Sequence, residues 1–370
     1  MKKQLLSTSI ALLCLTAFNS HAVTYLSAKA MVDVKDGKLI KSPLITIDDG
    51  VITNIEQNKK PTLTKDDKHI QLPDLTLMPG LMDMHVHLTS DPTVPRSERL
   101  GQSVPRMAIK AAHFAKKTLE AGFTTVRNVG AEGYSVIAVR DGINAGDIVG
   151  PRIWAAGPSL GITGGHCDNN RLPPELKYTS SGVADGPWAA RIKVRENIKY
   201  GANAIKFCAT GGVFSKGTKV GAQQYSFEEM KAIVDEAHMR DLPVAAHAHG
   251  TSGIKTAIKA GVDSVEHASF LDDEAIALAK EHGTWLSMDI YNTEYTLTYG
   301  EQNGVDEENL NKERQVSKRQ RDSFSRAVKA GVKMVFGTDA AIYPHGDNAK
   351  QFSRMVEFGM TDPQLIALSY

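Results

Sequence analysis

From Met78 onward, short apolar runs alternate with longer stretches in which apolar residues recur at helical spacing. The apolar runs are the expected strands, and they span residues 81–87, 124–129, 152–156, 204–208, 243–247, 264–267, 285–289 and 333–338. The stretches between them predict helices at 108–121, 188–200, 227–240, 253–260 and 322–330. Strands that alternate with helices in this way predict an α/β fold, specifically a (β/α)₈ TIM-like barrel. An open doubly wound sheet is the alternative, but the first strand lacks the Gly-x-Gly-x-x-Gly turn of its dinucleotide-binding version.

Helix boundaries within this region carry their own signals. Ser226 precedes the helix at 227–240 and Glu229 follows three residues later, which is the capping-box pattern. Glycine directly follows four of the expected helices, as is typical of a helix C-terminus, at Gly122, Gly201, Gly261 and Gly331.

Residues 23–78 have a different pattern, with β-branched runs and no helical period. A strand is expected at 24–33, and the runs 43–47 and 51–55 flank a turn at Asp48-Asp49-Gly50, which predicts a hairpin. We expect a small N-terminal β-sandwich unit here, followed by the barrel at residues 79–370.

The first 22 residues resemble a secretory signal peptide. Lys2 and Lys3 precede a short apolar segment, and Ser20-His21-Ala22 offers small residues at the positions that a cleavage site requires. We expect a secreted, periplasmic protein with no membrane attachment after cleavage; an uncleaved anchor is the alternative.

Composition changes this picture little. The chain has 370 residues, is 42% hydrophobic and 23% charged, and carries a formal net charge of +1, which argues against a nucleic-acid partner. After cleavage only Cys167 and Cys208 remain, too few for a disulfide framework. They could form one bridge in an oxidising compartment, but the simpler expectation is two partly buried free thiols.

Candidate chemistry gathers where the predicted strands end, which is where barrel enzymes carry their catalytic groups. His85 and His87 stand two residues apart, so a strand presents both on one face. Later strands contribute further polar groups at or near their ends, namely Lys206, His247, His267 and Asp339. Each alone has an ordinary structural explanation, such as a salt bridge, a core histidine or a helix cap. Together, so many ionisable groups at neighbouring strand ends would be unsatisfied without cations, and two divalent metals, expected to be Zn²⁺, resolve this.

This set resembles the amidohydrolase superfamily, in which the strand-4 lysine is carboxylated by carbon dioxide and bridges the two metals. Five further segments, at 163–168, 209–215, 246–250, 287–292 and 343–349, are similar to the imidazolonepropionase-like dipeptidase branch. That branch includes Xaa-Pro dipeptidases and zinc-dependent Lys/Arg carboxypeptidases, and the last two segments look most like the Lys/Arg-specific members.

The resemblance implies a division of roles. One metal would be held by His85, His87, Lys206 and Asp339, and the second by Lys206, His247 and His267. A hydroxide that bridges the metals would attack the peptide carbonyl, Asp339 would act as general base and then acid, and His166 would assist the oxyanion. His249 and His345 are candidate substrate contacts. Asp289 is the first candidate for binding a cationic side chain, with Asp168 and Asp347 behind it.

The expected function is therefore removal of a C-terminal Lys or Arg from dipeptides or short peptides by a binuclear metal site. Alternatives are the same site acting on Xaa-Pro or hydrophobic dipeptides or on a cyclic amide. Relative to the family, the chain stops inside the helix after the last strand, so we expect residues 23–78 to lack pairing partners, and an inactive truncated remnant is a further alternative. The expected partner is a small peptide substrate, and a homo-oligomer is compatible with the sequence.

Overall fold

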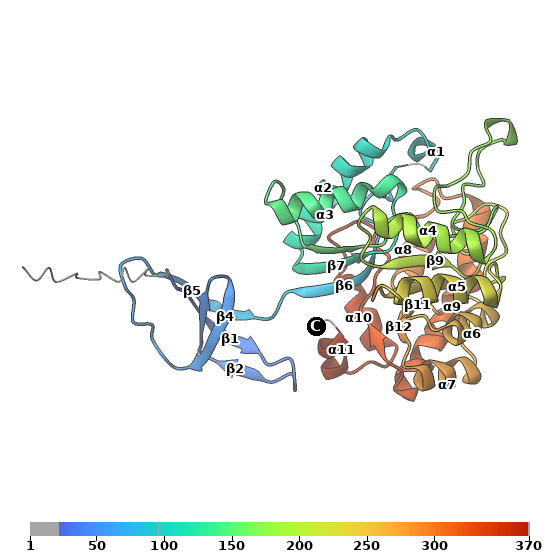
Figure 1. Cartoon of the computed structure of the whole chain (residues 1–370). Helices are drawn as coiled ribbons and strands as arrows, with labels where there is room; N and C mark the ends of the chain where they lie inside the picture. Colours follow the sequence, from blue (N-terminus) through green and yellow to red (C-terminus); the bar gives the residue numbers. More distant parts are fainter. Residues whose placement is uncertain (1–21, 95, 369–370) are drawn as a thin grey trace, which may run out of the picture. The chain divides into compact units, whose positions relative to one another are not determined.

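The computed structural model describes residues 22–94 and 96–368 (Figure 1). The chain divides into two compact units, and the division falls between Pro79 and Gly80. The predicted signal peptide lies outside the described residues, apart from Ala22. Among the described helices, none is both long and apolar enough to cross a membrane.

The first unit holds five strands in a single sheet, β1 Thr24–Val32, β2 Leu39–Lys41, β3 Pro43–Asp48, β4 Val51–Gln57 and β5 Lys68–Leu77. The predicted hairpin is confirmed, because β3 and β4 pair antiparallel around Asp49 and Gly50, both of which have positive φ. The expected two-layer sandwich is not seen in the described residues. The expectation of missing partners was wrong for β1, which pairs with β3 on one edge and with β5 on the other.

The second unit is built on parallel strands at the positions expected from the apolar runs. They are β6 Leu81–Val86, β7 Phe123–Asn128, β8 Arg152–Ala155, β9 Ile205–Cys208, β10 Val244–Ala248, β11 Ser264–His267, β12 Trp285–Ser287 and β13 Met334–Val335. They form two sheets, one of β6 to β8 and one of β9 to β13. The second unit is thus a mixed α/β fold.

Backbone hydrogen bonds link the two sheets at both junctions. Beyond β8, the Leu160 N–H donates to the Lys206 carbonyl (2.8 Å). Beyond β13, the Asp339 N–H donates to the His85 carbonyl (2.7 Å). The ends of the first and last strands therefore meet, and both carry candidate ligands.

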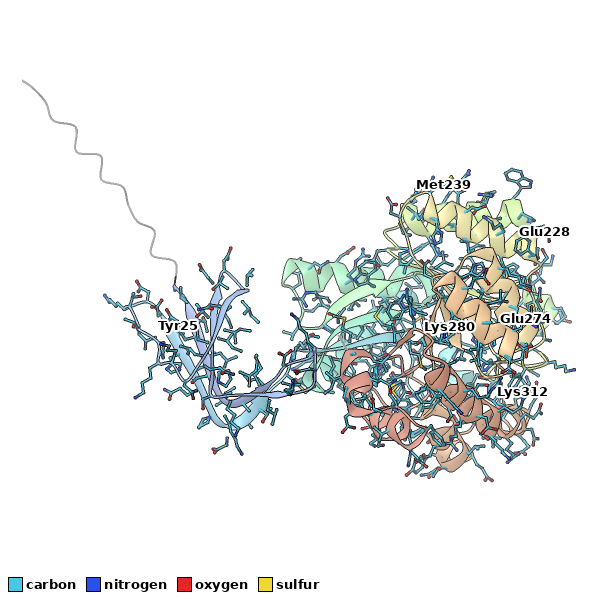
Figure 2. All side chains as sticks on the ribbon, turned by 90° about the horizontal axis from the view of Figure 1, so that it is seen from below. Tyr25, Glu228, Met239, Glu274, Lys280 and Lys312 are labelled. Carbon is cyan, nitrogen blue, oxygen red and sulfur yellow. A yellow bond between two sulfur atoms is a disulfide. The ribbon has the colours of Figure 1, made fainter. Side chains whose placement is uncertain are left out.

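Helices connect the strands: α1 Arg96–Arg99, α2 Val104–Glu120, α3 Ser135–Ala145, α4 Pro187–Lys199, α5 Phe227–His238, α6 Thr251–Ala260, α7 Asp273–His282, α8 Asn292–Tyr299, α9 Glu307–Ala330, α10 Lys350–Glu357 and α11 Asp362–Leu368. The Ser226–Glu229 capping box is confirmed, with both reciprocal bonds present at the start of α5. On α5 and α7, Glu228 and Glu274 in the first turns and Lys280 in the last turn lie at the surface, where they complement the helix dipoles (Figure 2).

The side chains of β9 alternate between the apolar core and a cavity. Ile205 and Phe207 are fully buried in the core, whereas Lys206 and Cys208 line the cavity. Since successive side chains of a strand point to opposite faces, one strand serves both packing and the site.

Candidate active site

A cavity of about 660 Å³ opens at the carboxyl ends of these strands. Its lining includes nearly all of the ionisable groups singled out from the sequence: His85, His87, His166, Asp168, Lys206, His247, His249, His267, Asp289 and Asp339. Residues far apart in the sequence therefore gather at the strand ends, as predicted from the pattern of strands. Their hydrogen bonds determine how each side chain is oriented.

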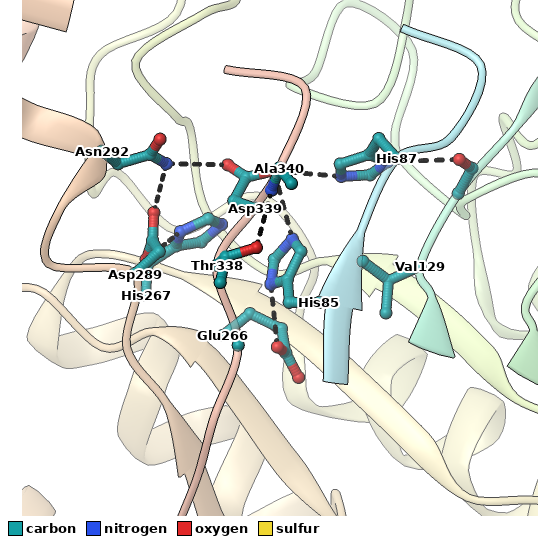
Figure 3. Close-up of polar contacts among 12 residues, drawn as sticks. His85, His87, Val129, Glu266, His267, Asp289, Asn292, Thr338, Asp339 and Ala340 are labelled. Carbon is teal, nitrogen blue, oxygen red and sulfur yellow. Dashed lines mark hydrogen bonds and ion pairs between the residues drawn. The ribbon is translucent and has the colours of Figure 1, made fainter. Parts of the chain in front are cut away.

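One group of side chains consists of His85, His87 and Asp339 (Figure 3). The Nε2 atoms of the two histidines lie 3.5 and 3.4 Å from the same oxygen, Asp339 Oδ1. The opposite ring nitrogens are held in place, since His85 Nδ1 bonds Glu266 Oε2 (2.9 Å) and His87 Nδ1 bonds the Gly130 carbonyl (3.2 Å). Both rings thus point Nε2 at a common centre, as second hydrogen bonds do for metal-binding histidines.

Glu266 is itself buried and fully engaged. It accepts from Arg127 Nη2 and from Ser264 Oγ, both at 2.6 Å, and Arg127 Nε also donates to the Met84 carbonyl (2.7 Å). A buried arginine–carboxylate pair therefore links β7 and β11 beneath the candidate centre and fixes His85 from below.

The second group consists of His247, His249 and His267. His267 Nδ1 bonds Asp289 Oδ1 (2.8 Å) and His249 Nδ1 bonds Ser269 Oγ (2.7 Å), whereas His247 Nε2 is buried with no hydrogen-bond partner in the described structure. The three ring centres are 4.6 to 4.8 Å apart.

Electrostatics favour neutral imidazoles at four of these positions. Burial lowers the pKa of His85, His247 and His249 well below the usual value and that of His87 to about 4, so each keeps a lone pair for a cation. Burial also lowers the pKa of Lys206 to about 8, which makes its uncharged amine, the form that reacts with carbon dioxide, accessible near neutral pH. The pKa of Asp339 is raised to about 7, again by burial, against the opposing charge of His267.

The loop that follows β8 brings His166 to the second group. The His166 ring stacks on His247 with centres 4.1 Å apart, and its Nδ1 bonds Ser215 Oγ (2.9 Å). A disulfide between Cys167 and Cys208 joins this loop to β9, so the expectation of two free thiols was wrong. Spatial proximity of residues 41 positions apart decides this pairing, and sequence alone does not show it.

Two of the expected substrate contacts, Asp289 and His345, are engaged within the protein. The Asp289 carboxylate accepts from His267, Asn292 and Gln320, so it orients a histidine and is not available to a substrate side chain. His345 is buried away from the cavity lining, where it bonds the Ser90 carbonyl (3.1 Å) and stacks on Phe114.

The two reserve aspartates are also engaged locally. Asp168 accepts from the backbone N–H groups of Gly164, Asn169 and Ser180, which folds its own loop, and Asp347 pairs with Lys350 near the start of α10. Of the expected substrate contacts, His249 and Asp289 both line the cavity and belong to candidate ligand groups.

Sequence reasoning missed four residues that shape the site: Arg127, Glu266, Asn292 and Glu313. A signal existed for Glu266, since a second ionisable residue beside His267 in a buried strand needs a partner. Asn292 bonds both Asp289 and Asp339 across the site (2.5 and 3.1 Å), and Glu313 comes from the cavity face of α9. No local pattern marks either of these two.

The donor set fits divalent cations. Three overlapping groups, the third made of His267, Asp289 and Asp339, each bring their ligand atoms within 4.8 Å of one another. Second hydrogen bonds fix the tautomers of His85 and His267, and one buried imidazole nitrogen, His247 Nε2, has no partner among the described residues. Imidazole and carboxylate ligands in such clusters suit zinc and similar ions.

Comparison with known proteins agrees with this geometry. Residues 76–366 match the amidohydrolase family model, and the chain belongs to the amidohydrolase family. It is 32% identical over 351 residues to the ochratoxinase of Aspergillus niger, which covers 89% of this chain and 71% of that protein.

Two solved structures are similar over 94% of this chain. One is a Xaa-Pro dipeptidase with methionine bound in its active site, at 37% identity and a TM-score of 0.86 over 87% of that chain. The other is a prolidase complexed with N-methylphosphonate-L-proline, at 30% identity and a TM-score of 0.84 over 85% of that chain. The chain is therefore a hydrolase of this family, and its relatives include dipeptidases.

Proposed function

We propose that this protein is a binuclear metal-dependent peptidase that cleaves the C-terminal peptide bond of dipeptides or short peptides. The observation that carries the proposal is the pair of buried ligand groups that meet around Asp339 and His267 on one cavity wall. The parallel strands whose sheets are joined at both junctions support a closed (β/α)₈ barrel as the frame of this site.

In this proposal His85, His87 and Asp339 would hold one Zn²⁺, and His247 and His267 would hold a second. Lys206 on β9, if carboxylated, would add oxygen ligands to the site. When bound, such ions polarise a substrate carbonyl and lower the pKa of water, which provides a nucleophile near neutral pH.

The protein's own residues complete the reaction. Asp339 accepts the proton of the attacking water and then delivers it to the leaving amine, and Asn292 orients its carboxylate through Oδ2 (3.1 Å). His166, stacked on His247 and anchored by Ser215, donates toward the developing oxyanion.

Two classes of C-terminal residue compete. Proline is favoured by the similarity to a Xaa-Pro dipeptidase and a prolidase, and a basic residue is favoured by an unpaired carboxylate in the cavity, Glu313. Hydrolysis by the full chain, loaded with Zn²⁺, of Ala-Pro, Ala-Met, Ala-Lys and Ala-Arg tests the proposal. We expect turnover that is abolished by a chelator; absence of hydrolysis of every dipeptide would contradict a peptidase.

We also propose that the protein is exported and acts as a secreted, periplasmic enzyme. A fusion of residues 1–30 to a reporter that is active only outside the cytoplasm should be active. The same fusion with Lys2 and Lys3 replaced by glutamate should lose most of that activity, and equal activity of both fusions would contradict export through this segment.

A further inference from the structure

Glu313 is a buried carboxylate that faces the cavity without a partner. It is 3% exposed and lines the cavity, yet within residues 22–94 and 96–368 its side chain has no hydrogen bond and no ion pair within 4 Å. Burial, followed by the negative charges of Asp289 and Asp339, raises its pKa to about 8. An unpaired buried carboxyl costs stability, so a protein that retains one has left room for a cation at that point.

Three cations near Glu313 are engaged elsewhere. Arg171 pairs with Asp306, and Arg99 donates to the backbone carbonyls of Val94 and Asp91. Lys312, next to Glu313 in α9, donates to the Ser215 carbonyl (2.6 Å) and pairs with Glu308. Lys216 also lines the cavity and Arg321 acts electrostatically on Glu313, but among the described residues neither lies within 4 Å of its carboxylate as an ion pair. The carboxyl of Glu313 is therefore open to a cation of the substrate.

The surroundings of Glu313 match a long side chain with a charged end. Val316 and Gln320 follow it at i+3 and i+7, so the three share one face of α9, and all three line the cavity. Val316 packs with Val213, and both border the same space. An apolar surface beside a carboxylate accommodates the methylene chain of lysine or arginine and then its cationic group.

The position of this face relative to the reacting atoms is also fixed. Gln320 donates to Asp289 Oδ1 (3.1 Å), which in turn holds His267, so the same helix face that carries Glu313 reaches the candidate ligands. Asn309 donates to the Val213 carbonyl and Lys312 to the Ser215 carbonyl, which fastens the 213–215 loop against α9 at two positions just before Glu313.

We propose that Glu313 is the specificity-determining residue that binds the ammonium or guanidinium group of a basic C-terminal residue of the substrate. This inference rests on the proposed peptidase function, and it replaces Asp289, whose carboxylate is occupied, as the recognition group. The α-ammonium of the substrate's first residue is a second source of the same charge, so the experiment has to separate the two.

The test compares kcat/KM for Ala-Lys and Ala-norleucine, which differ only in the terminal ammonium, and for N-acetyl-Lys, which has no α-ammonium. We expect the wild-type chain to prefer Ala-Lys over Ala-norleucine by about 10- to 100-fold, which is the usual range for a hydrogen bond to a charged group. Glu313→Gln should bring this ratio to within about threefold of one while Ala-norleucine turnover is retained. In Glu313→Gln, kcat/KM for N-acetyl-Lys should fall by the same factor as kcat/KM for Ala-Lys.

Two further variants are matched controls. Glu307→Gln removes an exposed carboxylate six residues earlier in the same helix, and its Ala-Lys preference should equal that of the wild type. Glu313→Asp keeps the charge on a shorter side chain and should retain part of the preference. Because Glu313 is unpaired, Glu313→Gln should unfold at the wild-type temperature or above, which excludes misfolding as the cause.

Three results would overturn the inference: no wild-type preference for Ala-Lys, a preference that Glu313→Gln leaves intact, or equal losses on Ala-Lys and Ala-norleucine with none on N-acetyl-Lys. The last would assign Glu313 to the α-ammonium. If no dipeptide is hydrolysed, the proposed function fails separately, and calorimetric binding of L-lysine against L-norleucine decides the role of Glu313. Loss of lysine binding alone in Glu313→Gln supports it, and unchanged lysine binding contradicts it.

Discussion

The two halves of the candidate site are held in different ways. His85 is fixed by Glu266, which belongs to a buried ion pair with Arg127 deep among the strands. His267 is fixed by Asp289, whose remaining partners are the neutral amides of Asn292 and Gln320 at the cavity wall. The first half therefore depends on a buried ion pair with an arginine, whereas the carboxylate of the second is shared between His267 and neutral amides.

We infer that breaking two similar histidine–carboxylate pairs should affect stability and activity to different extents. Lys206 lies on β9, at the edge of the second sheet, and belongs to neither half alone. Changes at Lys206 should therefore disturb both halves, changes at Glu266 should disturb the fold, and changes at Asp289 should disturb mainly the chemistry.

The largest expected effect follows Lys206→Ala, which removes the proposed bridge between the halves. Dipeptide hydrolysis should fall by about 10³-fold or more, since stabilisation by bound cations is worth several kcal/mol and each 1.4 kcal/mol is about tenfold in rate. Added propionate should restore part of the activity by replacing the carbamate. Lys318→Ala, on the exposed face of α9, is the control and should be unaffected. Wild-type turnover by Lys206→Ala would refute the bridging role.

The next largest effects compare one variant in each half of the site, Glu266→Gln and Asp289→Asn. Glu266→Gln leaves Arg127 buried without a counter-charge, so the second unit should lose about 3–5 kcal/mol of unfolding free energy. Asp289→Asn should cost less than about 1 kcal/mol of stability but lower activity about 10- to 100-fold, because His267 loses its anionic partner. Denaturant unfolding and hydrolysis rates check both variants. Equal stability losses in the two would remove the proposed distinction.

Removal of the disulfide tests how far the stability and activity of the second half depend on the loop that carries His166. Replacing both Cys167 and Cys208 by serine releases the His166 loop from β9, and the closed segment of 41 residues predicts a loss of about 4 kcal/mol. Activity should also fall about tenfold, because His166 is no longer held against His247. Reduction of the wild-type chain should reproduce both effects. An unchanged unfolding midpoint after reduction would argue against the bond.

The smallest effect concerns the helices that support β9 and β10. Arg195, together with Arg240 and Arg191, lowers the pKa of Glu236 from 4.5 to about 2, although burial of Glu236 acts in the opposite direction. The stabilisation is therefore complete above about pH 4.5 and disappears as the pH falls toward 2. Glu236→Gln should lower the unfolding free energy by about 1–3 kcal/mol at pH 7 and by less at pH 3. A difference that does not shrink on acidification would contradict this linkage.

Sequence patterns predicted most of the frame of the molecule. The apolar runs located every strand from β6 to β13, because buried parallel strands are nearly continuous apolar segments. The helical spacing missed α1, α7, α8 and α10. It also missed α3, whose interior is rich in β-branched residues such as Val136 and Ile137, and the first half of α9, where charged residues outnumber apolar ones.

The site was predictable only as far as strand ends define it. Histidines 85, 87, 247 and 267 could be grouped because the carboxyl ends of parallel strands meet at one edge. The hydrogen-bond partners within the site could not be predicted, because Glu266, Asn292 and Gln320 reach it only through tertiary packing. The three hydrogen bonds of Asp289 were invisible in the sequence for the same reason, whereas its residue type alone suits a cationic substrate.

The central claim is that both halves must be filled for peptide hydrolysis, and titration of the metal-free chain with Zn²⁺ tests it most directly. The rate of dipeptide hydrolysis is measured against the equivalents of zinc added per chain. We expect little activity at about one equivalent of zinc per chain and a plateau at about two equivalents. Full activity at one equivalent, or activity that persists in the chelated chain, would contradict it.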